Sequence, residues 1–272
     1  MAGLVPAIHD LRKKTWMPGT RPGMTLERVA MAPILTLENI SKRFGAVVVA
    51  DGIGLTLNDG EALGIIGPNG AGKTTLFGIA TGSVAPDGGR VLFDGKDITR
   101  LAPEGRCRMG LARSFQIPQP FSGMTVFENV VVAAAFGNDE SEKAVYGRCA
   151  ELLERCGLST KANQRAGGLT LLDRKRLELA RALATKPRVL LLDEVAGGLT
   201  EHECATLITL IKDVRAGGVS IIWIEHVVHA LLATVDRLAV LHGGSFIAEG
   251  DPHTVIKSPE VAEIYMGIAA DA

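Results

Sequence analysis

The chain has 272 residues, of which 47% are hydrophobic and 22% are charged, and its formal net charge at pH 7 is −1. A chain of this size and composition buries a substantial core, either as one domain with lobes or as two small domains. The near-neutral charge argues against a polyanionic partner, so we do not expect nucleic acid to bind. No uncharged apolar run approaches the ~18 residues that span a bilayer, so we expect any membrane association to occur through a partner.

The cysteines give no sign of disulfides. Cys107, Cys149, Cys156 and Cys204 are scattered along the chain, and none belongs to a C-x-x-C pair. A chain of this length does not need disulfides to be stable. We therefore interpret them as reduced thiols, as expected in a cytosolic protein.

The N-terminal segment differs in composition from the rest of the chain. It is rich in proline and in basic clusters, and its apolar start is interrupted at Pro6, which excludes a secretory signal peptide. It shows no sustained hydrophobic period. We predict that residues 1–31 are a disordered or mis-started extension, with Met24 or Met31 as the true start.

Strand patterns follow this segment. Ile34–Ile40 alternates as a strand does, and Val47–Leu57 predicts one or two more strands, interrupted at Asp51-Gly52. Further on, Arg90–Phe93 followed by Asp94-Gly95 predicts a hairpin. Together these segments predict an antiparallel β layer.

Between these strands lies the stretch with the clearest chemistry, residues 67–74 (GPNGAGKT), which fit G-x-x-x-x-G-K-[ST]. The apolar run Ala62–Ile66 predicts a buried strand before it, and Thr74–Ala80 predicts a helix after it. The glycines let backbone N–H groups turn toward a phosphate, and the helix N-terminus adds positive charge. Lys73 would reach the β- and γ-phosphates and Thr74 would ligate Mg²⁺. A glycine-rich turn before a helix is the alternative, but the flanking elements favour a nucleotide site.

The antiparallel layer flanks this loop, so we expect it beside the nucleotide. A lone aromatic such as Phe44 is more often a core residue, but here it can stack on adenine. The loop residues that we expect to contact the nucleotide are Gly67, Pro68, Asn69, Gly70, Ala71, Gly72, Lys73, Thr74 and Thr75.

Residues from about 117 to 185 are predicted to be mostly helical. Thr125–Glu128 is a capping box that opens an apolar stretch, and Arg148–Cys156 has helical spacing. Thr170–Asp173 is a second capping box, whose helix is expected to end before Pro187.

Signals of a parallel sheet come next. Val189–Leu192, Val219–Ile224 and Leu238–Leu241 are apolar runs without alternation, separated by helical segments. One of these helices begins with a third capping box at Thr200–Glu203, and another begins at Ser258-Pro259. We therefore expect an α/β domain with a buried parallel sheet.

Two acids, Asp193 and Glu194, end the first of these strands. Ligands of α/β sheets bind at the carboxyl ends of the strands, so Asp193 would hold Mg²⁺ through water and Glu194 would polarise the attacking water. Acids often follow strands, but together with the phosphate loop the pair is a strong signal. The long interval from Lys73 to Asp193 holds a hairpin and a helical lobe, for which a compact GTPase or small kinase has no room, and no N-K-x-D motif is present.

These motifs resemble the ATP-binding subunits of ABC transporters over roughly residues 33–268, and most of all those of branched-chain amino acid importers. The resemblance rests on GPNGAGKTT at 67–75, RSFQ at 113–116, LLLDE ending at Glu194, AGGL at 196–199, and WIEH at 223–226. MTVFEN at 124–129 and the ending Tyr265-Met266-Gly267 point to the importer subgroup. The resemblance to this family implies a P-loop NTPase fold with a RecA-like core, an antiparallel β subdomain and a helical subdomain at about 117–185. All three would lie within an ATP-binding domain at 32–272.

The resemblance also assigns roles to two residues. It implies that Gln116 senses Mg²⁺ and couples to the membrane subunit, and that His226 is the switch histidine on the γ-phosphate. A glutamine before Ile117-Pro118 can also simply cap a loop. His226 and His229 could suggest a metal pair, but the glutamate lies outside them, unlike in H-E-x-x-H, so we interpret His229 as an ordinary surface or lobe residue.

Two segments depart from the family pattern. Where the family has a signature of the L-S-G-G-Q type, this chain has Leu169-Thr170-Leu171-Leu172-Asp173, which keeps a hydroxyl at Thr170 but lacks both glycines. The loop after Glu194 has Val195 in place of proline and Thr200 in place of aspartate or asparagine. The family's signature contacts ATP held by the opposite subunit. We expect this chain to bind ATP fully and to complete its partner's site poorly.

The resemblance implies an ATPase, peripheral on the cytoplasmic face of a membrane, that uses ATP and Mg²⁺. Its partners would be permease subunits, a second ATP-binding subunit in a homodimer or heterodimer, and indirectly a solute-binding protein. The solute would be a branched-chain amino acid or a similar small molecule. A soluble ABC-type ATPase without a transport role and a weakly hydrolysing structural partner remain alternatives. The first of these usually carries two cassettes or a long coiled coil, which this chain lacks.

Overall fold

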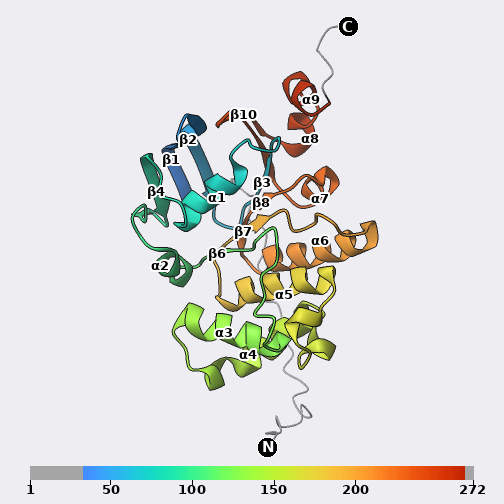
Figure 1. Ribbon diagram of the computed structural model, residues 1–272. Helices are drawn as coiled ribbons and strands as arrows, with labels where there is room; N and C mark the ends of the chain where they lie inside the picture. The colour runs from blue at the N-terminus through green and yellow to red at the C-terminus, as the bar shows by residue number, and fades with distance from the viewer. Residues whose placement is uncertain (1–32, 267–272) are drawn as a thin grey trace, which may run out of the picture. The chain divides into compact units, whose positions relative to one another are not determined.

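The computed structural model describes residues 33–266. Within that range the strands form two sheets. A four-stranded antiparallel sheet has the order β2-β1-β4-β5, and a six-stranded sheet has the order β10-β9-β3-β8-β7-β6 (Figure 1). Strands β3, β6, β7, β8 and β9 pair in parallel, and β10 pairs with β9 in the antiparallel sense. The predicted antiparallel layer and buried parallel sheet are both confirmed.

The strands are β1 (Pro33–Phe44), β2 (Val47–Asn58), β3 (Ala62–Ile66), β4 (Gly88–Phe93), β5 (Lys96–Asp97), β6 (Leu111–Arg113), β7 (Val189–Asp193), β8 (Ser220–Ile224), β9 (Arg237–His242) and β10 (Ser245–Gly250). The helices are α1 (Lys73–Thr81), α2 (Pro103–Arg108), α3 (Val126–Asn138), α4 (Glu142–Arg155), α5 (Leu171–Ala184), α6 (Glu201–Ala216), α7 (Val228–Leu232), α8 (Pro252–Val255) and α9 (Pro259–Met266). Two short 3-10 turns, Ser159–Lys161 and Ala166–Gly168, lie between α4 and α5.

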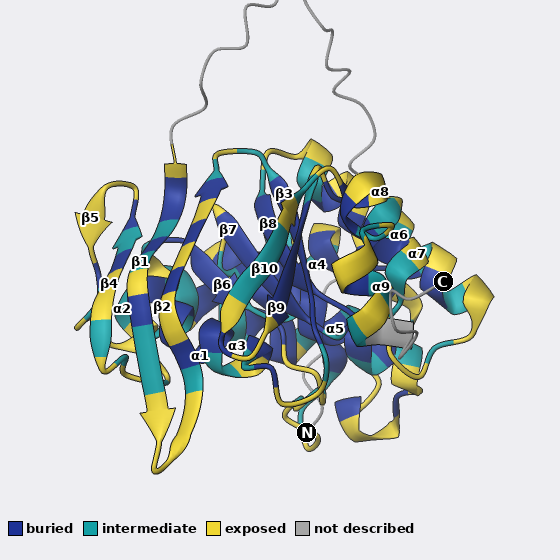
Figure 2. Cartoon of the chain, turned by 90° about the horizontal axis from the view of Figure 1, so that it is seen from above, coloured by how far each residue is buried: buried dark blue, intermediate teal, exposed yellow. Residues whose placement is uncertain are grey.

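The six-stranded sheet is covered on both faces, which explains why its central strands are apolar without alternation. In β7, Val189 and Leu191 pack with α1 and the antiparallel sheet, whereas Leu190 and Leu192 pack with the cluster of α3 to α6. Figure 2 shows the central strands as continuously buried. Their carboxyl ends therefore form a rigid edge on which side chains can be held accurately.

The antiparallel sheet differs from the sequence prediction at one point. The dipeptide Asp51-Gly52 does not divide the segment, because β2 runs unbroken through it. Ile40 pairs with Ile53 and Lys42 pairs with Ala50, so β2 has one extra residue there, and Gly52 has φ of 63°. The glycine thus marks a β-bulge, where a left-handed residue is needed, and not a turn between two strands.

The helices between β6 and β7 pack on one another, with α3 in contact with both α4 and α5. The capping boxes predicted for α3 and α6 are both present. The box predicted for α5 is only half formed: Thr170 Oγ1 accepts from Asp173 N at 3.3 Å, but the carboxylate of Asp173 accepts from the Thr170 hydroxyl and not from its backbone N–H. Aspartate is one methylene shorter than the glutamate of a full box, so it does not reach back.

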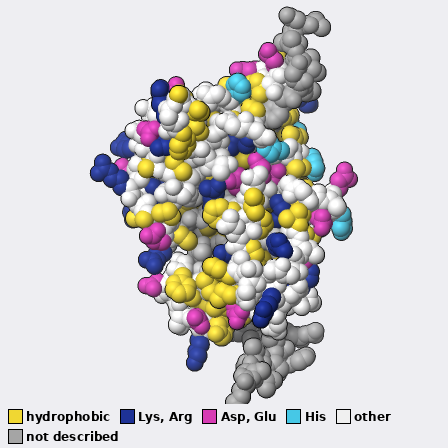
Figure 3. Space-filling view, in the orientation of Figure 1, with side chains coloured by type: hydrophobic (Ala, Val, Ile, Leu, Met, Phe, Trp, Pro, Cys, Tyr) yellow, Lys and Arg dark blue, Asp and Glu magenta, His cyan; other side chains and the backbone are white. Residues whose placement is uncertain are grey.

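A groove of about 290 Å³ lies between these helices and the sheet. Its lining includes Pro103 and Cys107 of α2, Arg113 at the end of β6, Phe115 just after it, and Ala182 of α5. Figure 3 shows hydrophobic side chains gathered on this part of the surface. Phe115 is 51% exposed and the nearby Ile117 is 72% exposed, so the groove has an apolar rim.

The extension predicted at 1–31 and Gly267 of the C-terminal motif lie outside the described residues. The domain boundaries stay a prediction. Of the helices in the described range, none is long and apolar enough to cross a bilayer.

Candidate nucleotide-binding and hydrolysis site

The loop between β3 and α1 has the backbone that a phosphate cradle requires. Gly72, the residue before α1, has φ of 101°, and a Cβ built there would lie 2.5 Å from the carbonyl oxygen of Val49 in β2. A Cβ on Gly67 would lie 2.2 Å from the carbonyl oxygen of Leu241 in β9. Both positions therefore accept only glycine, because other backbone segments approach the loop too closely for a side chain. The loop is wedged between β2 and β9, with its N–H groups at the start of a helix.

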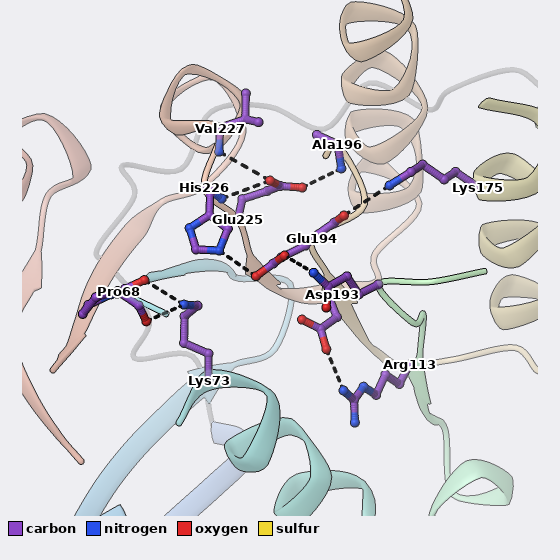
Figure 4. A network of polar contacts seen from close by, with 12 residues as sticks. Pro68, Lys73, Arg113, Lys175, Asp193, Glu194, Ala196, Glu225, His226 and Val227 are labelled. Carbon is purple, nitrogen blue, oxygen red and sulfur yellow. Dashed lines mark hydrogen bonds and ion pairs between the residues drawn. The ribbon is translucent and has the colours of Figure 1, made fainter. Parts of the chain in front are cut away.

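Lys73 is the first residue of α1, and it is only 5% exposed. Its ammonium donates to the carbonyl oxygens of Gly67 at 2.7 Å and Pro68 at 3.0 Å (Figure 4). Burial lowers the pKa of Lys73, and the negative charges of Glu194 and Asp193 oppose that shift. The lysine predicted to meet the phosphates and the acids predicted to meet metal and water are thus brought together, although they are distant in sequence.

Asp193 ends β7 and is 1% exposed. Its Oδ2 accepts from Arg113 Nη2 at 2.6 Å, and Arg113 comes from the end of the neighbouring strand β6. Its Oδ1 is buried and has no hydrogen-bond partner in the described part of the chain. Burial raises the pKa of Asp193, and the Arg113 guanidinium opposes that shift.

A buried carboxylate oxygen without a partner is a position where a cation or an ordered water is expected, because such an oxygen is costly to leave unpaired. The other predicted metal ligands are the exposed Thr74 hydroxyl at the start of α1 and the Gln116 side chain. Hydroxyl, amide and carboxylate oxygens are the ligands that Mg²⁺ prefers. Among residues 33–266, no group of three or more His, Cys, Asp or Glu side chains is placed to hold a metal. The unpartnered Asp193 Oδ1 and the oxygen donors of Thr74 and Gln116 fit a Mg²⁺ that would take further ligands from nucleotide phosphates and water.

Glu194 follows Asp193, and both of its carboxylate oxygens contact other residues of the site. Its Oε1 lies 2.7 Å from Nε2 of His226, and its Oε2 accepts from Nε2 of Gln116 at 2.5 Å. The sequence analysis assigned Glu194 to the attacking water, Gln116 to Mg²⁺ and His226 to the γ-phosphate, and the structure brings their side chains into direct contact. Glu194 has φ of 46°, an uncommon conformation for a residue with a side chain, which is typical of functional positions.

Glu225, at the end of β8, is a site residue that the sequence reasoning did not single out. It is 1% exposed, and its carboxylate accepts from the backbone N–H of Ala196 at 2.5 Å, of His226 at 3.1 Å and of Val227 at 3.4 Å (Figure 4). Burial raises the pKa of Glu225, and these N–H groups and the charge of Lys175 oppose the shift. The available signal was an acid at the carboxyl end of an apolar strand, the same signal that identified Asp193.

The remaining two predicted site residues lie apart from this group. Phe44 is 51% exposed at the tip of the β1–β2 hairpin, with Lys42 Nζ 5.3 Å from its ring centre. Val49 of that hairpin approaches the phosphate loop at Gly72, so the hairpin borders the nucleotide site. Phe44 is therefore not a core residue.

Thr170 is exposed at the start of α5, where it caps the helix. The hydrogen bonds of its side chain within the described residues are to Asp173, and none reaches the phosphate loop. The side chain of Leu171, the first residue of α5, is 46% exposed and packs close to Gly198 in the loop after β7. The signature segment thus has no direct part in the nucleotide site of its own chain.

Comparison with known proteins agrees with this geometry. The sequence profile described as "ABC transporter" matches residues 50–197. The chain is 35% identical over 254 residues to the high-affinity branched-chain amino acid transport ATP-binding protein BraF of Pseudomonas aeruginosa, covering 87% of this chain and 99% of BraF. It is 32% identical over 234 residues to the lipopolysaccharide export system ATP-binding protein LptB of Haemophilus influenzae, covering 86% of this chain and 97% of LptB.

Among solved structures, the ADP conformation of MJ1267, an ATP-binding cassette of an ABC transporter, superimposes with a TM-score of 0.81 at 33% identity. The match covers 88% of this chain and all of that one. The chain therefore belongs to the ABC transporter family, as an ATP-binding cassette with the P-loop NTPase fold, and ATP hydrolysis is the activity of this class.

Proposed function

We propose that this chain is the ATP-hydrolysing subunit of an importer for branched-chain amino acids or a similar small solute. The observation that carries the chemistry is the convergence of Lys73, Asp193 and Glu194 at the carboxyl ends of β3 and β7. The importer assignment is supported by the 35% identity to BraF. The similar identity to LptB, a lipopolysaccharide export ATP-binding protein, is the reason for testing the solute directly.

In this proposal the residues have separate tasks. The N–H groups of residues 67–75 and the Lys73 ammonium bind the phosphates, and Phe44 stacks on adenine. Asp193, Thr74 and Gln116 hold Mg²⁺, which when bound neutralises charge on the phosphates. Glu194 accepts the proton of the attacking water.

The contacts of Glu194 define what must change before hydrolysis. Its two carboxylate oxygens are engaged by His226 and Gln116. Because His226 is 40% exposed, it can turn toward the γ-phosphate and leave one oxygen of Glu194 free to accept from water. Gln116 would then link the metal to the segment just after β6.

That segment supplies a route to a membrane partner. Phe115, next to Gln116, and Arg113, which holds Asp193, both line the apolar groove between α2, α3 and α5. We propose that a segment of a membrane permease subunit occupies this groove, so that the chain is peripheral on the cytoplasmic face. A solute-binding protein would act through the permease. A second ATP-binding subunit would bring its own α5 N-terminus, with Thr170 or its equivalent, to the ATP held here.

The test is transport by the assembled complex. The chain is co-expressed with candidate permease subunits and reconstituted in vesicles, and uptake of labelled leucine is measured with ATP on the side of the membrane where this chain is bound. The proposal predicts uptake that depends on ATP and is lost with Lys73→Ala. An ATPase that copurifies with no permease, or a complex that moves material outward, would contradict the import assignment.

A further inference from the structure

Two buried charged residues beside Glu194, Glu225 and Lys175, have no task in the chemistry described so far. Glu225 is 1% exposed and Lys175, in α5, is 5% exposed. Burial lowers the pKa of Lys175, and the negative charges of Glu225 and Glu194 oppose that shift. Burying a charged group is costly, so the presence of two such groups here suggests a specific task.

Within the described residues, the hydrogen bonds of both side chains are to backbone groups. Glu225 accepts from the N–H of Ala196 in the loop after β7 and from the N–H groups of His226 and Val227 in the loop after β8. Lys175 donates to the carbonyl oxygen of Glu194 at 3.3 Å. The pair thus connects three segments: α5, the loop that carries Glu194, and the loop that carries His226.

Glu225 and Lys175 hydrogen-bond to backbone at and beside Glu194, whose own backbone conformation is strained. Glu194 has φ of 46°, a conformation that is strained for a residue with a side chain and persists only where neighbours hold it. Its N–H donates to Ile224 O at 2.9 Å, and its carbonyl accepts from Lys175. Without Lys175 or Glu225, we expect the loop to relax and the Glu194 carboxylate to turn away from His226.

We propose that Glu225 and Lys175 form a positioning pair that fixes Glu194 and His226 relative to each other for hydrolysis, without contacting nucleotide themselves. This inference rests on the proposed ATPase function. It predicts a defect in turnover and not in nucleotide binding, because the phosphate loop makes no hydrogen bond or ion pair with either residue within 33–266.

The test compares Glu225→Gln and Lys175→Met with a matched control, Glu61→Gln. Glu61 is also a largely buried carboxylate that pairs with an arginine, Arg237, and accepts a backbone N–H, from Asn58 at 2.8 Å. It lies just before β3, at the end of the sheet opposite to the site. Glu61→Gln therefore reports the general cost of losing a largely buried carboxylate away from the site.

We expect Glu225→Gln and Lys175→Met each to lower kcat at least ~10-fold, with KM and the nucleotide Kd changed less than ~3-fold, the pattern of an interaction that matters in the transition state. Because the two residues act as a unit, the double variant should be no slower than the slower single variant. Glu61→Gln should keep kcat within ~2-fold of wild type, since it loses only a distant pair.

Glu225→Asp is the second variant if the first two fail to fold. It keeps the charge that Lys175 needs but is one methylene too short to reach both loops, so kcat should again fall while Kd holds. Glu194→Gln is the reference. If Glu194→Gln is inactive but Glu225→Gln or Glu225→Asp is as active as Glu61→Gln, this inference alone is overturned. If Glu194→Gln is fully active, the assignment of Glu194 in the proposed function is overturned.

Discussion

The signature segment, residues 169–173, lacks the two glycines of the family pattern, and we predict how much restoring them changes the rate of ATP hydrolysis. The change is Leu171→Gly with Leu172→Gly, which restores the two glycines typical of the family. In the proposed dimer, the N-terminus of α5 faces the partner's nucleotide, and leucine side chains prevent the close backbone approach that glycine allows. Losing one N–H donor aimed at developing charge costs ~10²- to 10³-fold in rate, so we expect the double variant to raise kcat of a homodimer at least ~10-fold.

The same change has a cost in stability. Each glycine near the start of a helix loses up to about 1 kcal/mol of helix propensity. Leu171 is 46% exposed and touches Gly198, so its truncation adds about 1 kcal/mol of lost burial. The total of about 2–3 kcal/mol lowers the melting temperature by roughly 4–12 °C in a domain of this size. ATPase assays must therefore be run well below the lowered melting temperature.

The assay compares two assemblies, the homodimer and a mixed dimer with a sister ATPase that carries an intact glycine signature. In the mixed dimer, the site built from Lys73, Asp193 and Glu194 of this chain should hydrolyse normally, so the glycines should help the homodimer more. A fast wild-type homodimer that the glycines do not improve would refute this reasoning. It would mean that the α5 N–H groups, capped by Thr170, suffice without them.

Three further predictions test single features. Gly67→Ala should abolish nucleotide binding or folding, because its Cβ would lie 2.2 Å from Leu241 O, whereas Gly54→Ala, with nothing within 4 Å, should bind nucleotide as wild type does in a fluorescence titration. Phe44→Ala should weaken ATP binding by about 1–3 kcal/mol if the ring stacks on adenine. Phe44→Tyr should not weaken it, and equal affinity in all three proteins would show that the ring does not touch the base. Deleting residues 1–30 should leave melting temperature and ATP binding unchanged, since the segment has no periodic apolar face, and a drop of several degrees by calorimetry would contradict this.

The parts of the fold and site that follow from local patterns could be predicted from the sequence. The phosphate loop is a run of adjacent residues between a strand and a helix, so its pattern predicts its geometry. Asp193 and Glu194 were found because an apolar strand ends in them. The parallel strands were found because both of their faces are buried, which leaves an unbroken apolar run.

Contacts between distant segments could not be predicted in this way. Arg113 holds Asp193 across two neighbouring strands, and Glu225 accepts N–H groups from two loops that are far apart in sequence. No period or spacing encodes such contacts, which depend on strand order. The half-formed cap of α5 depends on the length of the Asp173 side chain, and the bulge at Gly52 depends on the partner strand. Sequence patterns resolve neither.

The central claim is that Glu194 polarises the attacking water while Lys73 binds the phosphates. Measuring ATP affinity and turnover in Glu194→Gln and Lys73→Ala tests it most directly. The account predicts that Glu194→Gln loses turnover with nearly unchanged affinity, because the phosphate and metal contacts remain, and that Lys73→Ala loses affinity itself. An equal loss of nucleotide binding in both variants would contradict the account.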